Sequence, residues 1–244
     1  MNYSLYKLTI KEYLYGGCIF AAVAYLMSYL FYDSVIPLLI LLPCVIFFYK
    51  YMRQSLKKKR DRVITTAFKD MLISISSLLS TGHSLENAIS EAKKEIFSLH
   101  GNCIIYEELV LIEKKLHLNI PIETAFSDFA LRTDIEIIHT FSEILSIAKQ
   151  SGGDLRAVIL STTSNISSQV DIRMEIATHL AGQKLELYIM TAMPPIIMIY
   201  IKLTNNGFFN SVYHNFLGII VMTICLIIYI ASVFLAYKII STTE

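Results

Sequence analysis

The stretch Gly152-Gly153-Asp154-Leu155-Arg156-Ala157-Val158 has the order of residues that ends one helix and begins the next. Glycine suits the left-handed position after a helix, and aspartate suits the N-terminal cap of the following helix. The same order recurs in Gly82-His83-Ser84-Leu85-Glu86-Asn87-Ala88 and in Asn119-Ile120-Pro121-Ile122-Glu123-Thr124-Ala125. The sequence therefore repeats a corner between two helices three times. The structural residues of these corners are Gly82, Ser84, Asn119, Pro121, Gly152, Gly153 and Asp154.

The segments beside the corners have apolar residues at three- and four-residue steps, which is typical of amphipathic helices. No alternating run of strand type competes with this pattern. Because short corners make neighbouring helices antiparallel, we expect an all-helical bundle of six helices over 53–184. The expected helices are at about 62–81, 84–98, 104–118, 121–131, 134–151 and 154–181.

Apolar runs on both sides of this region indicate helices that span a membrane. A bilayer core about 30 Å thick requires about 20 apolar residues in a helix. The composition agrees, since 55% of the 244 residues are apolar and only 17% are charged. We expect an N-terminal hairpin over 1–52, the helical domain over 53–184 and a C-terminal hairpin over 185–244. The four expected spans are at about 13–32, 35–52, 185–203 and 216–238.

The basic residues near the spans predict the orientation, because Lys and Arg that flank a span are retained in the cytoplasm. Seven basic residues follow the second span, from Lys50 to Arg62, whereas the connectors at 33–34 and 205–215 have none. We therefore expect a multi-pass protein of the inner (cytoplasmic) membrane, with both termini and the 53–184 domain in the cytoplasm. The basic run is interpreted as a topology determinant, and a docking patch for an acidic partner is the alternative.

Motifs of catalysis and ligand binding are absent from the sequence. No segment has the G-x-x-x-x-G-K-[ST] form that wraps phosphates, so the chain is not expected to hydrolyse nucleotide. The six histidines and four cysteines lack metal-ligand spacing, and a net charge of +1 offers no general field for nucleic acid. We therefore expect no enzyme activity, no catalytic, cofactor-binding or metal-binding residue, no cofactor and no nucleic-acid partner.

The pair Pro194-Pro195 interrupts the third expected span. Proline has no backbone N–H, so the pair frees the carbonyls of Met190 and Thr191. This predicts either a hinge that transmits motion or a static kink tolerated by neighbouring helices. The sixth helix of the domain is expected to run almost directly into this span, so motion of the bundle could be passed to the membrane.

These features together resemble the platform proteins of type II secretion and pilus assembly, the protein F (T2SSF) family. The resemblance rests on the corners, on Gly152-Gly153-Asp154-Leu155 after Ala148, and on Leu180-Ala181-Gly182-Gln183 before a span that contains Pro194. The chain is most similar to the tight-adherence (Tad) pilus branch, whose members have one such cytoplasmic domain. The resemblance implies a membrane scaffold that couples a cytoplasmic secretion or pilus ATPase to the extraction and assembly of pilin-like subunits.

Further partners implied by the resemblance are other copies of the chain or a paralogous platform protein, within the lipid bilayer. A membrane signalling receptor with a helical relay domain is the alternative function, although its short outer connectors leave little surface for a ligand. After Arg62, the domain through Lys184 has 10 basic and 15 acidic residues, an excess that can steer a basic partner surface. We expect Glu107, Glu108 and Glu113 to form the partner interface, and their joint reversal to Lys to leave the protein folded without filament assembly.

Overall fold

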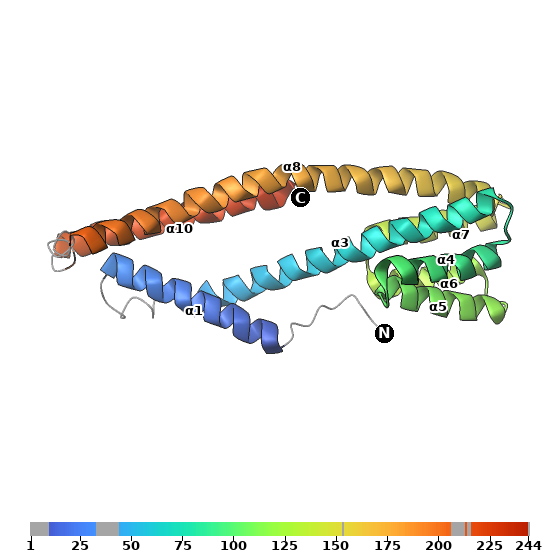
Figure 1. The fold of residues 1–244 in the computed structure, drawn as a ribbon, viewed down its shortest axis with the longest axis horizontal. Helices are drawn as coiled ribbons and strands as arrows, with labels where there is room; N and C mark the ends of the chain where they lie inside the picture. Colours follow the sequence, from blue (N-terminus) through green and yellow to red (C-terminus); the bar gives the residue numbers. More distant parts are fainter. Residues whose placement is uncertain (1–9, 33–43, 153, 206–212, 214–215, 244) are drawn as a thin grey trace. The chain divides into compact units, whose positions relative to one another are not determined.

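The computed structural model describes residues 10–32, 44–152, 154–205, 213 and 216–243. These residues are helical almost throughout and contain no strand, so the expected all-helical fold class is confirmed. The helices in chain order are α1 (Ile10–Tyr32), α3 (Cys44–Ser80), α4 (Leu85–His100), α5 (Ile104–His117), α6 (Ile122–Thr133), α7 (Glu136–Gln150), α8 (Leu155–Thr204) and α10 (Phe216–Thr243) (Figure 1).

The chain folds into two compact units. The first contains Gln54–Arg173 and so holds the C-terminal part of α3, the helices α4 to α7 and the N-terminal part of α8. The second contains Leu8–Arg53 and Met174–Glu244, and so holds α1, α10 and the remaining parts of α3 and α8. Both boundaries between the units therefore fall inside a continuous helix.

The helix α3 is longer than the sequence pattern predicts. The described part of the expected second span, 44–52, and the expected first helix of the bundle belong to a single helix from Cys44 to Ser80. The reason is that the basic segment between them contains neither Gly nor Pro and is rich in Lys and Arg, which are good helix formers. Nothing in this segment stops the helix, although its charge separates the two apolar parts.

The first unit is an antiparallel bundle in which α5 packs against α4 and α6, and α6 packs against α7. Since the chain reverses at each turn, the turns after α3, α5 and α7 lie together at one end of the bundle (Figure 1). We name this the corner end, defined by Gly82, Asn119 and Gly152. The turns at Gly101 and Asp134 lie at the opposite end, where α3 enters and α8 leaves, which we name the entry end.

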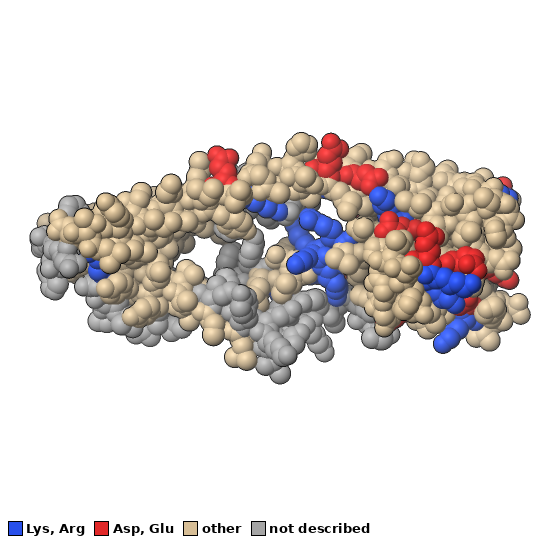
Figure 2. All heavy atoms as spheres, in the orientation of Figure 1, with Lys and Arg blue, Asp and Glu red and all other residues tan. Residues whose placement is uncertain are grey.

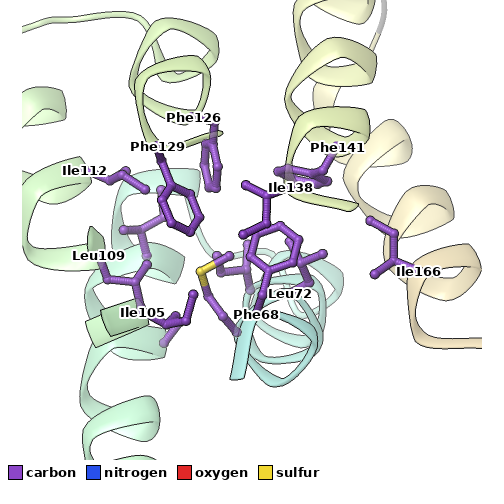
Figure 3. Close-up of a cluster of buried hydrophobic side chains, with 14 of the residues drawn as sticks. Phe68, Leu72, Ile105, Leu109, Ile112, Phe126, Phe129, Ile138, Phe141 and Ile166 are labelled. Atoms are coloured by element: carbon purple, nitrogen blue, oxygen red, sulfur yellow. The ribbon is translucent and has the colours of Figure 1, made fainter. Parts of the chain in front are cut away.

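Aromatic rings form the centre of the bundle core (Figure 3). Phe68 of α3 lies with its ring centroid 5.7 Å from that of Phe141 in α7 and 6.0 Å from that of Phe129 in α6. Phe126 completes the cluster at 5.1 Å from Phe141. The apolar stripes of five helices, α3 to α7, and the first turns of α8 thus meet in one core. Its burial is the main stabilising contribution to the first unit.

Three helices of the described chain are long and apolar enough to cross a membrane: Met52–Ser80, Leu155–Thr204 and Leu217–Ala236. The apolar window of the first is 44% buried inside the protein, against 6% for each of the others, because α3 supplies core side chains to the bundle. The expected span at 185–203 falls within the second of these helices, and the one at 216–238 overlaps the third. A shorter apolar helix, Gly16–Tyr32, lies at the first expected span, and the N-terminal half of 35–52 lies outside the described residues.

The second unit has a small core of its own, in which α1 and α10 pack together around Leu30, Phe31 and Met222. The hydroxyl groups of Tyr32 and Thr223 are hydrogen-bonded at 2.8 Å and join the same two helices. Apolar packing and a hydrogen bond between side chains are the interactions that hold helices together inside a bilayer.

The C-terminal end of α1 is capped by side chains from elsewhere in the second unit. Lys202 Nζ donates to the carbonyl of Tyr29 at 3.2 Å and lies 3.5 Å from the centroid of the Tyr29 ring. The hydroxyl of Tyr213 donates to the carbonyl of Leu30. Both carbonyls belong to the last turn of α1, where the helix provides no amide donor for its carbonyl groups. The cation–π contact and the two hydrogen bonds therefore attach α1 to the C-terminal part of the chain.

Candidate functional site

The three repeated corners have left-handed backbone conformations. The φ angle is 95° at Gly82, 57° at Asn119 and 68° at Gly152. Glycine adopts such angles without strain, and asparagine tolerates them better than other residues do. No atom lies within 4 Å of a Cβ built on Gly82 or Gly152, so the backbone conformation alone requires glycine there.

The helices that follow the three corners differ in how their first turn is capped. Ser84 caps α4 by accepting a hydrogen bond from the Asn87 amide at 3.4 Å, and the side chain of Asp154 accepts one from the Arg156 amide at 2.9 Å. Pro121 precedes α6 and offers no side-chain acceptor. Gly153 lies outside the described residues. Side-chain caps satisfy amides that have no partner in the first turn of a helix.

Gly82→Ala is expected to lower the free energy of unfolding by about 1 kcal/mol, because alanine is strained at this φ angle while space is available. Gly82→Asn is expected to cost less. The matched control is Gly182→Ala, since Gly182 lies inside α8 without a positive φ angle and with open space around it. Thermal unfolding of the purified full chain in detergent measures the three effects. Equal stability of Gly82→Ala and Gly82→Asn would contradict the corner assignment.

The corner motif does not include two further residues with positive φ angles, which lie at the entry end. Gly101 has a φ angle of 66° after α4, and Asp134 has a φ angle of 56° after α6. Gly101 could have been found from the sequence, because it directly follows an amphipathic helix that ends in a basic turn. Asp134 has no such signal, since aspartate is more common at the start of a helix than in this position.

Acidic and basic side chains are interspersed on the bundle surface (Figure 2), and several carboxylates are held in ion pairs between helices. Each pair joins two different helices of the bundle. They are Lys69–Asp171, Asp70–His100, Lys93–Glu113, Glu108–Arg132 and Lys115–Asp128. These pairs leave the acidic excess of the bundle unchanged, because each joins one carboxylate to one basic side chain, but they occupy carboxylates that a partner would otherwise contact.

Glu108, one of the three residues expected at the partner interface, is buried inside the bundle. Its side chain is 1% exposed. Arg132 Nε donates to Glu108 Oε1 at 3.1 Å, and Arg132 Nη2 donates to Glu108 Oε2. This two-bond pair joins α5 to α6 inside the bundle. The reason for the difference is that Glu108 shares the buried face of α5 with Ile105, Leu109 and Ile112, which places it one turn from core residues.

Glu113 and Glu107 have different surroundings from each other. Glu113 Oε2 lies 2.5 Å from Lys93 Nζ. Burial by itself raises the pKa of Glu113, but hydrogen bonds from Lys93 and Ser90 and the positive charges of Lys93 and His117 outweigh it, so the pKa is lowered. The stabilisation that results is present at neutral pH and is lost as the pH falls through the lowered pKa. Glu107 is partly exposed in the first turn of α5, at the entry end.

The two prolines lie inside α8, which continues through them from Leu155 to Thr204. The Tyr229 hydroxyl of α10 donates to the carbonyl of Thr191 at 2.7 Å. This carbonyl is one of the two that Pro194 and Pro195 deprive of an amide donor. A side chain from the neighbouring helix therefore replaces a missing backbone hydrogen bond, which is how proline is tolerated in a membrane helix.

No group of three or more His, Cys, Asp or Glu side chains in the described part of the chain could hold a metal ion. The site residues that can be placed are thus structural corners, ion pairs and a proline pair. An all-helical bundle joined by continuous helices to apolar, membrane-length segments defines a helical membrane protein.

The family model described as "Type II secretion system (T2SS), protein F" matches residues 71–201. This is 131 of 244 residues (201 − 71 + 1 = 131), more than half of the chain, so the chain belongs to this family. The comparisons with curated proteins and with solved structures returned no match. The family comprises membrane platform proteins related to type II secretion and type IV pili, and the resemblance found from the sequence is confirmed.

Proposed function

We propose that this chain is the integral membrane platform of a Tad or related pilus or type II secretion machine. In this function it couples a cytoplasmic ATPase to the extraction and assembly of pilin-like subunits. The observation that carries the proposal is the family match, which runs from α3 inside the bundle to the apolar part of α8. The proposed coupling of the ATPase to subunit extraction is supported by the continuity of α8, because a helix transmits displacement along its axis better than a flexible linker does.

The proposed topology has four spans, at 13–32, 35–52, 185–203 and 216–238, with a cytoplasmic six-helix bundle over 53–184 and both termini in the cytoplasm. The basic residues from Lys50 to Arg62 support this orientation. Prolines 194 and 195 are proposed as the point at which α8 bends when the bundle moves. The chain is proposed to act as an oligomer, either with its own copies or with a paralogous platform protein.

The topology predicts which positions react from outside intact cells. In a variant without the four native cysteines, single cysteines at Ser34 and Asn206 are expected to react with a membrane-impermeant thiol reagent. A cysteine at Asn87 is expected to react only after permeabilisation, because its helix α4 belongs to the bundle. Reaction at Asn87 in intact cells would overturn the orientation.

The ATPase is proposed to bind the bundle. Glu86 is exposed in the first turn of α4 at the corner end, whereas Glu107 is partly exposed at the entry end. Glu108 and Glu113 are less suitable contacts because each is held in an ion pair. The three corners support the corner end as the docking region, since they gather exposed turns from three parts of the chain on one surface.

Affinity purification of the full chain in mild detergent tests the proposal. Recovery of a secretion-type ATPase together with pilin-like subunits is expected, and the mass of the complex gives the number of platform copies. Deletion of the chain is expected to abolish the filament. Recovery of a kinase, with filaments intact in the deletion strain, would instead support a signalling receptor.

A further inference from the structure

A groove runs between α8 and α10 in the second unit, with a volume of about 310 Å³. Its lining residues on α8 recur at three- and four-residue steps from Gln183 to Pro194, and those on α10 recur in the same way from Tyr229 to Ala236. One face of each helix therefore forms the groove. Eleven residue steps of helix correspond to about 16 Å, which is about half of the bilayer core.

One residue that lines the groove has a backbone carbonyl without its usual helical donor. Met190 and Pro194 both line the groove, and the carbonyl of Met190 has no amide donor four residues later because that residue is proline. The carbonyl of Thr191 also lacks its helical donor, because the residue four positions later is Pro195. It accepts a hydrogen bond from the Tyr229 hydroxyl instead. Inside a bilayer no water replaces such a donor, so an occupant that donates a hydrogen bond is favoured here.

The end of the groove carries a carboxylate. Glu186 lines the groove together with Gln183 and Ala236, and it is exposed. It forms no ion pair with any of the described residues. The nearest basic residues in the sequence, Lys184 and Lys238, do not line the groove. A carboxylate at the edge of the bilayer attracts a positive charge more strongly than it would in bulk water, because the local dielectric is lower.

We propose that this groove binds one transmembrane helix of a partner that carries a positive charge at the Glu186 end. The proposal rests on the proposed function, in which the partner is the pilin-like subunit and this end is cytoplasmic. Ser232 and Ala236, one turn apart on α10, are small and allow a third helix to approach closely. A lipid fits less well, because an acyl chain offers no donor to Met190 and Glu186 repels an anionic headgroup.

Photo-crosslinking in intact cells tests the occupant. A photoreactive amino acid at Ser232 is expected to capture a small protein with one apolar span and a positive charge at its cytoplasmic end, identified by mass spectrometry. The control is the same amino acid at Ala231, which has the same depth but does not line the groove. Capture at Ser232 is expected to exceed that at Ala231 and to fall about tenfold in Glu186→Lys.

Reversal of the positive residue of the captured partner to Glu is expected to restore capture in Glu186→Lys. Capture of lipid alone, equal capture at both positions, or capture that Glu186→Lys does not change would each overturn the proposal. A second pair of variants fills the groove instead. Ser232→Phe is expected to insert normally and to retain the ATPase but to lose filaments, whereas Ala231→Phe is expected to keep them.

These variants test the groove assignment separately from the proposed function of the whole chain. If deletion of the chain leaves filaments intact, the proposed function fails. If deletion abolishes filaments but Ser232→Phe, present at normal levels in the membrane, still makes them, only the groove assignment fails.

Discussion

Phe68→Ala is expected to lower the free energy of unfolding of the helical bundle by about 3–5 kcal/mol. The Phe68 side chain is fully buried and contacts the rings of Phe129 and Phe141 from two other helices. Its removal leaves a cavity that three helices cannot close without moving. Because domains of this size are stable by only about 5–15 kcal/mol, the loss is a large fraction of the total.

The measurement is urea unfolding of the segment 54–173, which has its own core, followed by circular dichroism. The matched control is Val63→Ala on the same helix, because Val63 is 60% exposed. This substitution is expected to change the free energy of unfolding by no more than about 0.5 kcal/mol. If both variants unfolded at the same urea concentration, the position of α3 in the core would be wrong.

Arg132→Ala is expected to destabilise the bundle more than Glu108→Ala, although the two residues form one ion pair. The Arg132 side chain is 23% exposed and can reach water when its partner is removed, whereas Glu108 is 1% exposed and cannot. A buried charge without a partner costs about 3–5 kcal/mol. The asymmetry is therefore a direct consequence of the different burial of the two groups.

The double variant Arg132→Ala/Glu108→Gln provides the test, measured by the same urea unfolding. It is expected to be more stable than Arg132→Ala alone, because a neutral amide replaces the unpaired carboxylate. Together with the single variants Arg132→Ala and Glu108→Gln, it completes a double-mutant cycle that gives the coupling between the two residues. Additive effects of the two single substitutions would show that Glu108 and Arg132 do not interact.

The Glu108–Arg132 pair also changes what a charge-reversal experiment can report. Reversal of Glu107, Glu108 and Glu113 to Lys puts a positive charge beside Arg132 inside the bundle and another beside Lys93. We expect the triple variant to unfold, so loss of filaments in it would not identify a docking surface. Glu86→Lys at the corner end is the better test of ATPase binding, because Glu86 is exposed.

Local patterns of the sequence predict the helices of the bundle well. The ends of α4, α5, α6 and α7 lie within two residues of the expected positions. The reason is that helix ends depend on neighbours in the chain: a left-handed residue such as Gly82 stops one helix, and a cap such as Ser84 starts the next. Helix continuity is harder to predict, because α3 extends through a segment that only lacks a stop signal, whereas α8 continues through Gly182, Pro194 and Pro195.

The sequence alone determined that this protein is all-helical, apolar enough for a membrane and similar to secretion platform proteins, since composition, periodicity and corner motifs are local properties. Only the tertiary structure decided which charged residues are exposed. Glu107 and Glu108 are adjacent in the sequence, yet Glu108 alone is buried, because the 100° turn between successive helix residues places it toward α6 and Arg132. The groove likewise exists only because α10 packs beside the proline-containing part of α8.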